Sequence, residues 1–283
     1  MKPLKVIGVP EHFNLPWHMA IEEGAFEDRG IDLQWEDIPE GTGRMAKMLR
    51  AGEADIAIIL TEGIIKDIIA GNPSKIVQTY VASPLVWGIH VGAASAYQTV
   101  SELQHTKAAI SRFGSGSHLM AYVNANQNNW KKDALQFEVI HNLDGAIDAL
   151  TEGTADYFMW EKFTTKPLVD DGTFRRVGEC PTPWPCFVMA ASHTLLDNSP
   201  TLVQHVLEVI NMYTSEFKMI PSIDRTLANR YGQQLADIQE WLSITRWSQE
   251  NLSSQTLNTI QDTLHSFGII DQKLDAAQIL YQP

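Results

Sequence analysis

The amino-acid sequence predicts an α/β protein with mostly parallel sheets, built as two related halves and a helical C-terminal part. Strand-like and helix-like apolar patterns alternate from the N-terminus to about Ser192. Leu49–Asp55 and Leu150–Asp156 share the pattern L-x-x-G-x-A-D, which in both places leads from a helical pattern into a strand pattern. Beyond Ser192 the apolar spacing is mainly helical. Together these three observations predict the fold class.

Alternating strands and helices are predicted in the first half of the chain. The apolar side chains of Met45, Met48 and Leu49 recur at the spacing that places them on one helix face. Asp55–Leu60 is almost continuously apolar, which is typical of a strand covered on both faces. The predicted strands are Leu4–Val9, Ile31–Trp35, Asp55–Leu60, Lys75–Val81 and Val86–Val91. The predicted helices are Trp17–Glu27, Thr42–Ala51 and Ile64–Ile69.

The same alternation is predicted to begin again at Lys107. Gly114 and Gly116 open a helix that extends to about Gln127, and Pro181–Pro185 is a stiff, proline-rich crossing. The predicted strands are Lys107–Ser111, Phe137–Ile140, Ala155–Trp160 and Phe174–Val177, with a further helix at Asp144–Leu150. The helices predicted in the C-terminal part are Leu202–Ile210, Leu235–Leu242 and Thr256–Phe267.

Two crossings of the chain, near Gly88–Gly92 and near Cys186–Ala190, are predicted to divide it into lobes. Lobe I is expected to comprise residues 1–90 with 190–283, and lobe II residues 91–189. No low-complexity linker separates the two. The chain is therefore expected to pass twice between lobes through strands.

Composition and charge exclude several classes of protein. The chain has 44% hydrophobic and 19% charged residues, which is an ordinary globular balance. The 21 Lys and Arg residues are outnumbered by 34 Asp and Glu residues, giving a net charge of −13. Such an acidic surface repels phosphate backbones, so no nucleic-acid partner is expected.

One uncharged stretch and the N-terminus bear on location. From Ile76 to Ser101 no residue is formally charged, a length that can span a bilayer. Polar residues and glycines such as Gln78, His90 and Gly92 interrupt it, so two strands joined by a turn are predicted, without membrane insertion.

The N-terminus leads directly into a strand pattern and lacks the apolar core of a secretory signal. A cytoplasmic protein is expected, or a periplasmic one if a leader has been removed.

Motifs for cofactors, metals and nucleophiles are poorly matched. Gly41–Ala46 fits G-x-G-x-x-A at the start of a helix, with Glu62 as the ribose acid, so a dinucleotide-binding oxidoreductase is an alternative. A capped polar loop is favoured over it. The nine histidines form no H-E-x-x-H motif, and the spacing of Cys180 and Cys186 indicates two free thiols. We therefore expect no metal, no cofactor and no catalytic residue.

The loop at Ser111–Ser117 is a candidate ligand-binding loop. Its glycines let backbone amides turn inward, and the amino end of the following helix attracts an oxygen-rich ligand group. Ser117 is expected to cap this helix, with Ser115 lying earlier in the turn. An ordinary capped turn is the alternative interpretation.

Acidic and aromatic residues follow several predicted strands. Glu11, Glu62 and Glu161 each come after a strand, and ligands of open α/β sheets bind beyond the carboxyl ends of strands. Acids combined with aromatic rings favour an amine-bearing or heteroaromatic ligand. Solvated acids and packed rings are the alternative. The residues expected to bind ligand are Glu11, His12, Phe13, Thr61, Glu62, Arg112, Ser115, Gly116, Ser117, Trp160, Glu161 and Trp184.

A family resemblance extends these expectations. Gly24–Leu33 resembles the G-x-F-x-x-x-G-I-D-L segment of solute-binding proteins for nitrate, sulfonate, taurine and thiamine-pyrimidine precursors. The chain is most similar to a signal-less branch of bacterial and fungal members. The matching segments are Pro39–Gly43, Leu49–Asp55, Leu60–Gly63, Gly114–His118, Leu150–Asp156 and Trp184–Phe187.

The resemblance implies a two-lobed type II periplasmic-binding-protein fold with two hinge strands and a helical C-terminal part. It implies a non-catalytic protein that closes its lobes over a small molecule, and an ABC permease partner is left open. The alternative is an enzyme like the thiamine-pyrimidine synthases. Where those enzymes carry a lysine and a histidine, this sequence has Ile59 and Gly63, and their cysteine-rich iron motif is missing.

Overall fold

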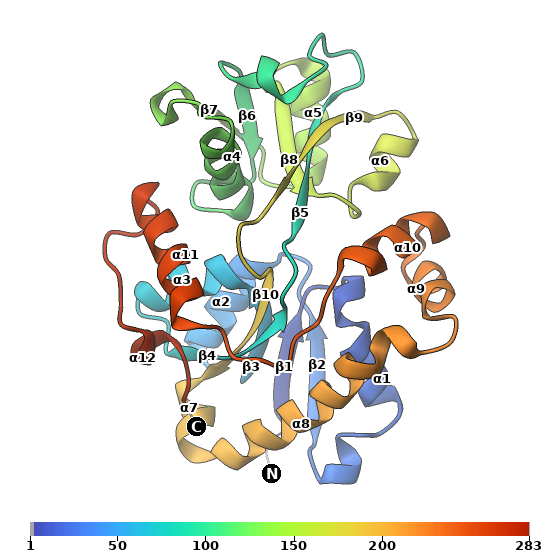
Figure 1. Cartoon of the computed structure of the whole chain (residues 1–283), viewed down its shortest axis with the longest axis vertical. Coiled ribbons are helices and arrows are strands. Elements are labelled where there is room, and N and C mark those ends of the chain that lie inside the picture. The colour runs from blue at the N-terminus through green and yellow to red at the C-terminus, as the bar shows by residue number, and fades with distance from the viewer. Residues whose placement is uncertain (1–2, 283) are drawn as a thin grey trace. The chain divides into compact units, whose positions relative to one another are not determined.

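The computed structural model describes residues 3–282, which fall into two compact units. Unit 1 is formed by the chain up to Ser83 and from Trp184 onward, and unit 2 is Pro84–Pro183 (Figure 1). These boundaries lie earlier than the predicted ones at 90/91 and 189/190. The reason is strand pairing, because the strand at 86–92 pairs within unit 2 and the strand at 187–192 pairs within unit 1.

Unit 1 contains a five-stranded sheet with the order β2-β1-β3-β10-β4. β1 runs parallel to β2 and β3, whereas β10, which enters after the second crossing, is antiparallel to β3 and β4. The sheet is therefore mixed rather than mostly parallel. Its strands are β1 (Leu4–Gly8), β2 (Leu33–Asp37), β3 (Ile56–Leu60), β4 (Ser74–Val81) and β10 (Phe187–Ser192).

Three helices in the N-terminal part of unit 1 bury the apolar faces that the sequence indicates. Met45, Met48 and Leu49 are buried, as is most of β3. Burying each such side chain contributes roughly 1.5–3 kcal/mol. The first helix ends at Glu22, earlier than predicted, and a 3-10 turn (Glu27–Arg29) leads to Gly30 in the left-handed conformation. The helices are α1 (Leu15–Glu22), α2 (Thr42–Ala51) and α3 (Thr61–Ile69).

Unit 2 repeats this arrangement with the strand order β7-β6-β8-β5-β9. β6 is parallel to β7 and β8, and β5, which enters after the first crossing, is antiparallel to β8 and β9. The strands are β5 (Val86–Gly92), β6 (Lys107–Ile110), β7 (Gln136–Val139), β8 (Tyr157–Glu161) and β9 (Phe174–Pro181). The helices are α4 (Gly116–Gln127), α5 (Leu143–Glu152) and α6 (Lys166–Asp170).

The L-x-x-G-x-A-D repeat performs the same structural task in both units. Its glycine ends a helix in the left-handed conformation, with φ 69° at Gly52 and 72° at Gly153. Its aspartate then accepts a hydrogen bond from the backbone N–H at the second residue of β1 in unit 1 and the first residue of β6 in unit 2. The distances are 2.8 Å from Lys5 N to Asp55 Oδ2 and 2.7 Å from Lys107 N to Asp156 Oδ2.

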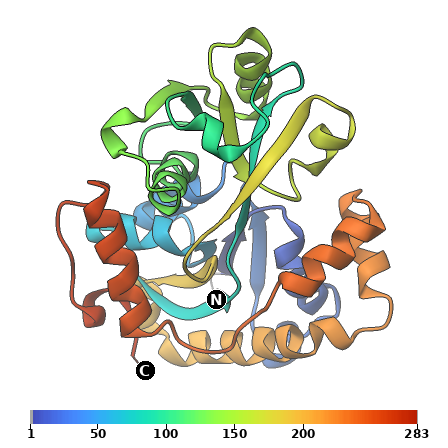
Figure 2. The ribbon, with the colours of Figure 1, turned by 45° about the horizontal axis from the view of Figure 1, so that its top comes forward.

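The C-terminal part of unit 1 is helical, as predicted. α8 is its long helix, which buries Val203, Val206 and Ile210 and packs against α1 (Figure 2). The helices are α7 (His193–Asn198), α8 (Pro200–Glu216), α9 (Ile223–Tyr231), α10 (Leu235–Ile244), α11 (Ser254–Ser266) and α12 (Ala276–Ile279). Between residues 3 and 282, no helix has both the length and the apolarity needed to cross a membrane.

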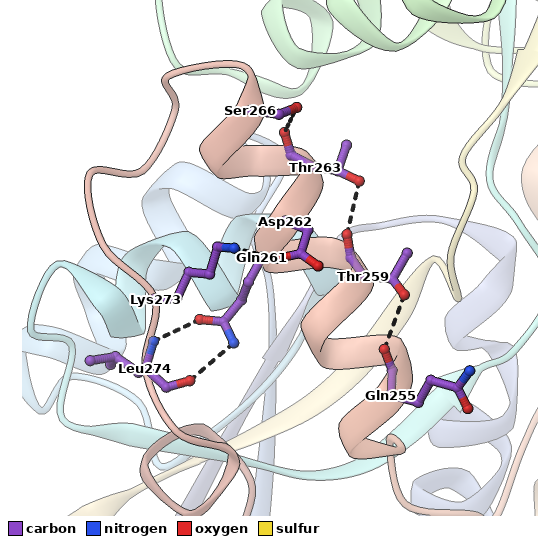
Figure 3. Close-up of polar contacts among 8 residues, drawn as sticks. All are labelled: Gln255, Thr259, Gln261, Asp262, Thr263, Ser266, Lys273 and Leu274. Carbon is purple, nitrogen blue, oxygen red and sulfur yellow. Dashed lines mark hydrogen bonds and ion pairs between the residues drawn. The ribbon is translucent and has the colours of Figure 1, made fainter.

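The buried amide of Gln261 attaches the segment after α11 to that helix (Figure 3). Its Oε1 accepts a hydrogen bond from Leu274 N at 2.8 Å, and its Nε2 donates to Leu274 O at 3.1 Å. The side chain of Gln261 thus satisfies both the backbone N–H and the backbone carbonyl of Leu274. An ion pair between Lys273 and Asp262 lies beside this contact.

Replacing Asp156 with alanine should destabilise unit 2, because the N–H of Lys107 loses its carboxylate acceptor. Hydrogen bonds to charged groups contribute about 1.5–3 kcal/mol, and we expect a loss of this size in the free energy of unfolding, measured with urea. Asp148→Ala is the control, since Asp148 is exposed on α5 and should change stability by less than about 0.5 kcal/mol. Equal effects of the two substitutions would contradict the assigned role.

Candidate functional site

Glu62 is a buried acid at the first turn of α3, where the chain leaves β3. Its carboxyl is 3% exposed, and its Oε2 accepts a hydrogen bond of 2.8 Å from Trp184 Nε1. Its Oε1 is buried and has no hydrogen-bond partner within residues 3–282. Burial raises the pKa of Glu62 to about 7, and hydrogen bonds from its own N–H and from Trp184 offset part of this shift. The carboxyl therefore has unused hydrogen-bonding capacity.

The preceding residue, Thr61, holds the segment that carries Trp184. The hydroxyl of Thr61 donates to Pro185 O at 2.6 Å, and its N–H donates to Cys186 O at 3.0 Å. These bonds position the Trp184 indole against Glu62. The structure thus brings together Thr61, Glu62 and Trp184, three of the residues expected to bind ligand, and the Thr61 hydroxyl is occupied within the protein.

His12 and Phe13, which follow β1, lie in an aromatic cluster. The His12 ring lies 4.1 Å from the ring of Trp241 and 5.9 Å from that of Tyr231. Burial lowers the pKa of His12 to about 3, so its imidazole is neutral. His12 Nε2, Trp241 Nε1 and Tyr231 Oη are buried without hydrogen-bond partners in the described chain. Phe13 is buried, and its carbonyl accepts hydrogen bonds from Tyr80 Oη and Trp247 Nε1.

Trp241 and Tyr231 were not among the residues expected from the sequence. They lie in the C-terminal helices α10 and α9, and no motif connects them to His12. Their aromatic identity is the only signal in the sequence, and it does not distinguish them from core residues. Glu11, by contrast, is half-buried at the start of the turn that carries His12. The pKa of the Cys186 thiol is raised by burial first, then by the charge of Glu62, and least by that of Glu11.

In unit 2, Trp160 and Glu161 end β8 beside Trp87 of β5. The rings of Trp87 and Trp160 meet edge to face at 6.3 Å. Gly116, at the start of α4, lies against Trp87, and a Cβ there would come within 3.0 Å of that ring. Trp87 is 5% exposed, and its Nε1 has no hydrogen-bond partner in the described residues. This face of unit 2 therefore combines aromatic rings with a closely approaching helix terminus.

Glu161 is buried like Glu62 but is much better satisfied. Its Oε2 accepts hydrogen bonds from the backbone N–H groups of Phe163 and Thr164 and from the Thr164 hydroxyl, at 2.6–2.9 Å. Burial raises the pKa of Glu161, and these hydrogen bonds and Lys162 oppose the shift. Glu161 thus holds the turn after β8.

The hydroxyl groups of the serine loop bond to one another and to the local backbone. Ser115 is the N-cap of α4, and its Oγ accepts a hydrogen bond from His118 N at 3.3 Å. The expectation that Ser117 caps this helix is wrong, because the helix already begins at Gly116. Ser117 Oγ instead accepts from Ser111 N at 3.0 Å and lies 3.1 Å from Ser115 Oγ. Arg112 is exposed in the same loop.

The two thiols are buried, and the described residues form no metal-binding cluster. Cys180 and Cys186 are free and buried, and burial raises the pKa of the Cys180 thiol to about 12 and holds that of Cys186 well above its usual value. In the part of the chain that the structure describes, no three His, Cys, Asp or Glu side chains gather where they could hold a metal ion. Both thiols are protonated at neutral pH.

Comparison with known proteins places these features in a family context. Residues 87–180 match the profile of the Ca3427-like PBP family, where PBP stands for periplasmic binding protein. The CA3427 gene product of Candida albicans, described as having the generic periplasmic binding protein fold, is 27% identical. Its TM-score is 0.87 over 98% of this chain and 93% of that chain. A search of curated protein sequences finds no match.

Two sulfonate-binding proteins share the fold. The alkanesulfonate-binding protein SsuA of Xanthomonas axonopodis pv. citri, bound to MOPS, is 17% identical with a TM-score of 0.82 over 99% of this chain and 98% of that one. SsuA of Escherichia coli, an aliphatic sulphonate binding protein, is 18% identical with a TM-score of 0.77 over 100% and 93%. The predicted resemblance to type II periplasmic-binding-protein-like proteins and the predicted two-lobed α/β fold are confirmed.

The stability of the protein should record the state of Glu62. Because its folded pKa is raised from 4.5 to about 7, the folded protein binds more protons than the unfolded chain between these pH values. The free energy of unfolding should therefore fall as pH rises through this window, by up to about 3 kcal/mol at 1.4 kcal/mol per pKa unit. Glu62→Gln should remove this component in urea unfolding measured from pH 4.5 to 7.5.

The pKa values of His12 and His90 are lowered to about 3 and 4, so these groups make the free energy of unfolding rise with pH in acid. The quantity to compare is therefore the slope of the free energy of unfolding against pH in each variant and in the wild type. Glu27→Gln, at an exposed acid of unit 1, should keep the wild-type slope. Identical pH profiles for the wild type and Glu62→Gln would show that Glu62 ionises normally.

Ser115→Ala should lower the free energy of unfolding by about 0.5–2 kcal/mol, the usual effect of losing an N-cap. Ser115→Thr keeps a capping hydroxyl and should retain most of the stability. Urea unfolding of both variants checks this. Wild-type stability in Ser115→Ala would mean that the cap contributes nothing.

Proposed function

We propose that this chain is a non-catalytic solute-binding protein whose ligand carries an amine or an amino-substituted heteroaromatic ring. The fold is that of periplasmic binding proteins, and two proteins that share it bind sulfonates. The proposed ligand chemistry rests on Glu62, whose Oε1 is buried and has no hydrogen-bond partner in the described residues.

The chemistry of Glu62 favours a nitrogen-bearing ligand. Burying a polar atom without a hydrogen bond costs about 1–3 kcal/mol, so a ligand group that pairs with Oε1 recovers this energy. An ammonium group pairs with the carboxylate. An amino-heteroaromatic edge pairs with Oε1 in either form, since its amino N–H donates to the carboxylate and its ring nitrogen accepts a hydrogen bond from the protonated acid. A sulfonate offers only acceptors and negative charge, which the carboxylate repels.

Unit 2 supports a flat or cationic ligand. The half-buried Trp160 meets the buried Trp87, whose ring lies against Gly116 at the start of α4 and whose indole N–H has no partner in the described residues. Aromatic faces attract both heteroaromatic rings and cations.

Protonated thiols support the absence of covalent catalysis. A cysteine nucleophile requires a lowered thiol pKa, and those of Cys180 and Cys186 are raised. The neutral imidazole of His12 contacts aromatic rings and has no hydroxyl or thiol partner in the described chain that it could activate. The alternative is a synthase that acts on a thiamine precursor. It requires a lysine and a histidine where this chain has Ile59 and Gly63.

A thermal-shift panel tests the proposal. Primary amines and aminopyrimidines at millimolar concentration should raise the melting temperature, because a ligand that binds only the folded state stabilises it by mass action. Taurine, alkanesulfonates and nitrate should not. Glu62→Gln should abolish most of the shift, whereas Glu27→Gln, at an exposed acid of the same unit, should preserve it.

Other outcomes would overturn the proposal. Stabilisation by taurine or nitrate and by no amine would assign the protein to anion binding. A near-ultraviolet absorption band of bound pyridoxal phosphate or nicotinamide in the purified protein would favour an enzyme. If the proposal holds, native mass spectrometry of the purified protein should detect a co-purified small molecule whose mass fits a nitrogen-containing compound.

A further inference from the structure

A groove in unit 1 lies outside all the residues discussed above as candidate ligand contacts. It has a volume of about 300 Å³ and lies between α1 and α8, helices that pack against each other. Its lining residues are Met19, Glu23, Met212, Tyr213, Glu216 and Ile220. Together these six residues are called the α1–α8 groove.

The apolar part of this groove is exposed and rich in methionine. Met212 is 50% exposed, and Met219, next to Ile220, is 72% exposed. These are two of the five exposed large hydrophobic residues in the described chain. Methionine side chains are flexible and polarisable, so a surface built from them adapts to the apolar side chains of a partner. Exposed apolar groups gathered at a groove indicate a contact surface.

The polar part of the groove is acidic. Glu23 accepts a hydrogen bond of 2.6 Å from the Tyr213 hydroxyl, and Glu216 lies one α-helical turn from Met212. Neither carboxylate forms an ion pair within residues 3–282, and no basic residue lines the groove. Burial and the negative charges of Glu23 and Asp28 raise the pKa of Tyr213 to about 12.

Charges near the groove are otherwise neutralised or directed elsewhere. Arg230 pairs with Glu22 at 2.8 Å, and Arg29 pairs with Glu208 at 2.9 Å. Lys218 does not line the groove, and its pKa is lowered by partial burial and then by the charge of Arg246. The groove lining therefore combines apolar side chains with two carboxylates and no basic residue.

We propose that the α1–α8 groove binds a basic amphipathic helix of a partner protein. Leucine-like side chains on one face of such a helix fill the space between the methionines, and lysine or arginine on its flanks pair with Glu23 and Glu216. The charge argues against a second copy of this chain as the occupant. Each copy carries a net charge of −13 and the same acidic groove, so two copies repel each other.

A synthetic helix of about 14 residues, with leucine on one face and lysine on the other, is the probe. The protein is labelled with ¹³C at its methionine methyl groups, which gives nine reporters. The signals of Met19, Met212 and Met219 should shift on titration. Signals from buried methionines such as Met45 and Met189 should not. This readout locates the contact and does not depend on the ligand of the proposed solute site.

Matched variants separate groove binding from general attraction to an acidic protein. Glu216→Lys should weaken peptide binding about tenfold, and Met212→Gln should weaken it comparably. Asp271→Lys makes the same charge change at an exposed acid that does not line the groove, and should weaken binding less than about threefold. All three wild-type side chains are exposed, so the variants should fold, which circular dichroism verifies.

Three results would overturn the proposal. In the first, a peptide of the same composition without an apolar face binds equally well. In the second, Glu216→Lys and Asp271→Lys weaken binding to the same extent. In the third, saturating peptide leaves the methyl signals of Met19 and Met212 unchanged.

Discussion

The hydrogen bond from an aspartate to the backbone N–H of the neighbouring parallel strand fixes the geometry of both units. In unit 1 Asp55 accepts from Lys5, and the next residues pair as Val6 with Ile56. In unit 2 Asp156 accepts from Lys107, and Ala108 pairs with Tyr157. The two registers are equivalent. A shift by one residue would turn each buried strand over, so this single acceptor determines which residues follow at the carboxyl ends of the strands.

Those carboxyl ends carry two buried acids whose chemistry differs because of their neighbours. Glu161 receives three hydrogen bonds from the turn that follows it, so the protein itself satisfies its charge. Glu62 accepts hydrogen bonds from its own N–H and from the Trp184 side chain, and keeps an unpartnered oxygen. Glu161 is the last residue of β8 and Glu62 is the second residue of α3, so the two acids lie near corresponding strand ends without occupying equivalent positions of the repeat. One is structural and the other is available. The proposed ligand chemistry depends on this difference.

The sequence predicts what local pattern controls, and fails where distant residues decide. Strand and helix alternation, the glycine of the repeat and the buried helix faces follow from spacing alone. The aromatic partners of His12, Tyr231 and Trp241, come from helices far along the chain, so no local signal reveals them. The sequence assigns the N-cap of α4 to Ser117, whereas the structure has it at Ser115. Several serines occur in this turn, and only the residue at which the helix begins decides which of them is the cap.

Ligand choice in this fold is separable from the fold itself. Sulfonate-binding proteins that are 17% and 18% identical share the architecture, and at that distance the likeness concerns the fold alone. In this chain the Trp184–Cys186 segment is held by Thr61 and in turn places an indole N–H on Glu62. Burial raises the pKa of Glu62, whereas the N–H of Glu62 itself and then this indole N–H lower it, so the balance among them sets whether the acid meets a ligand charged or neutral. In the proposed function, the short segment entering β10 therefore tunes specificity, while the aspartate-fixed strands only supply its position.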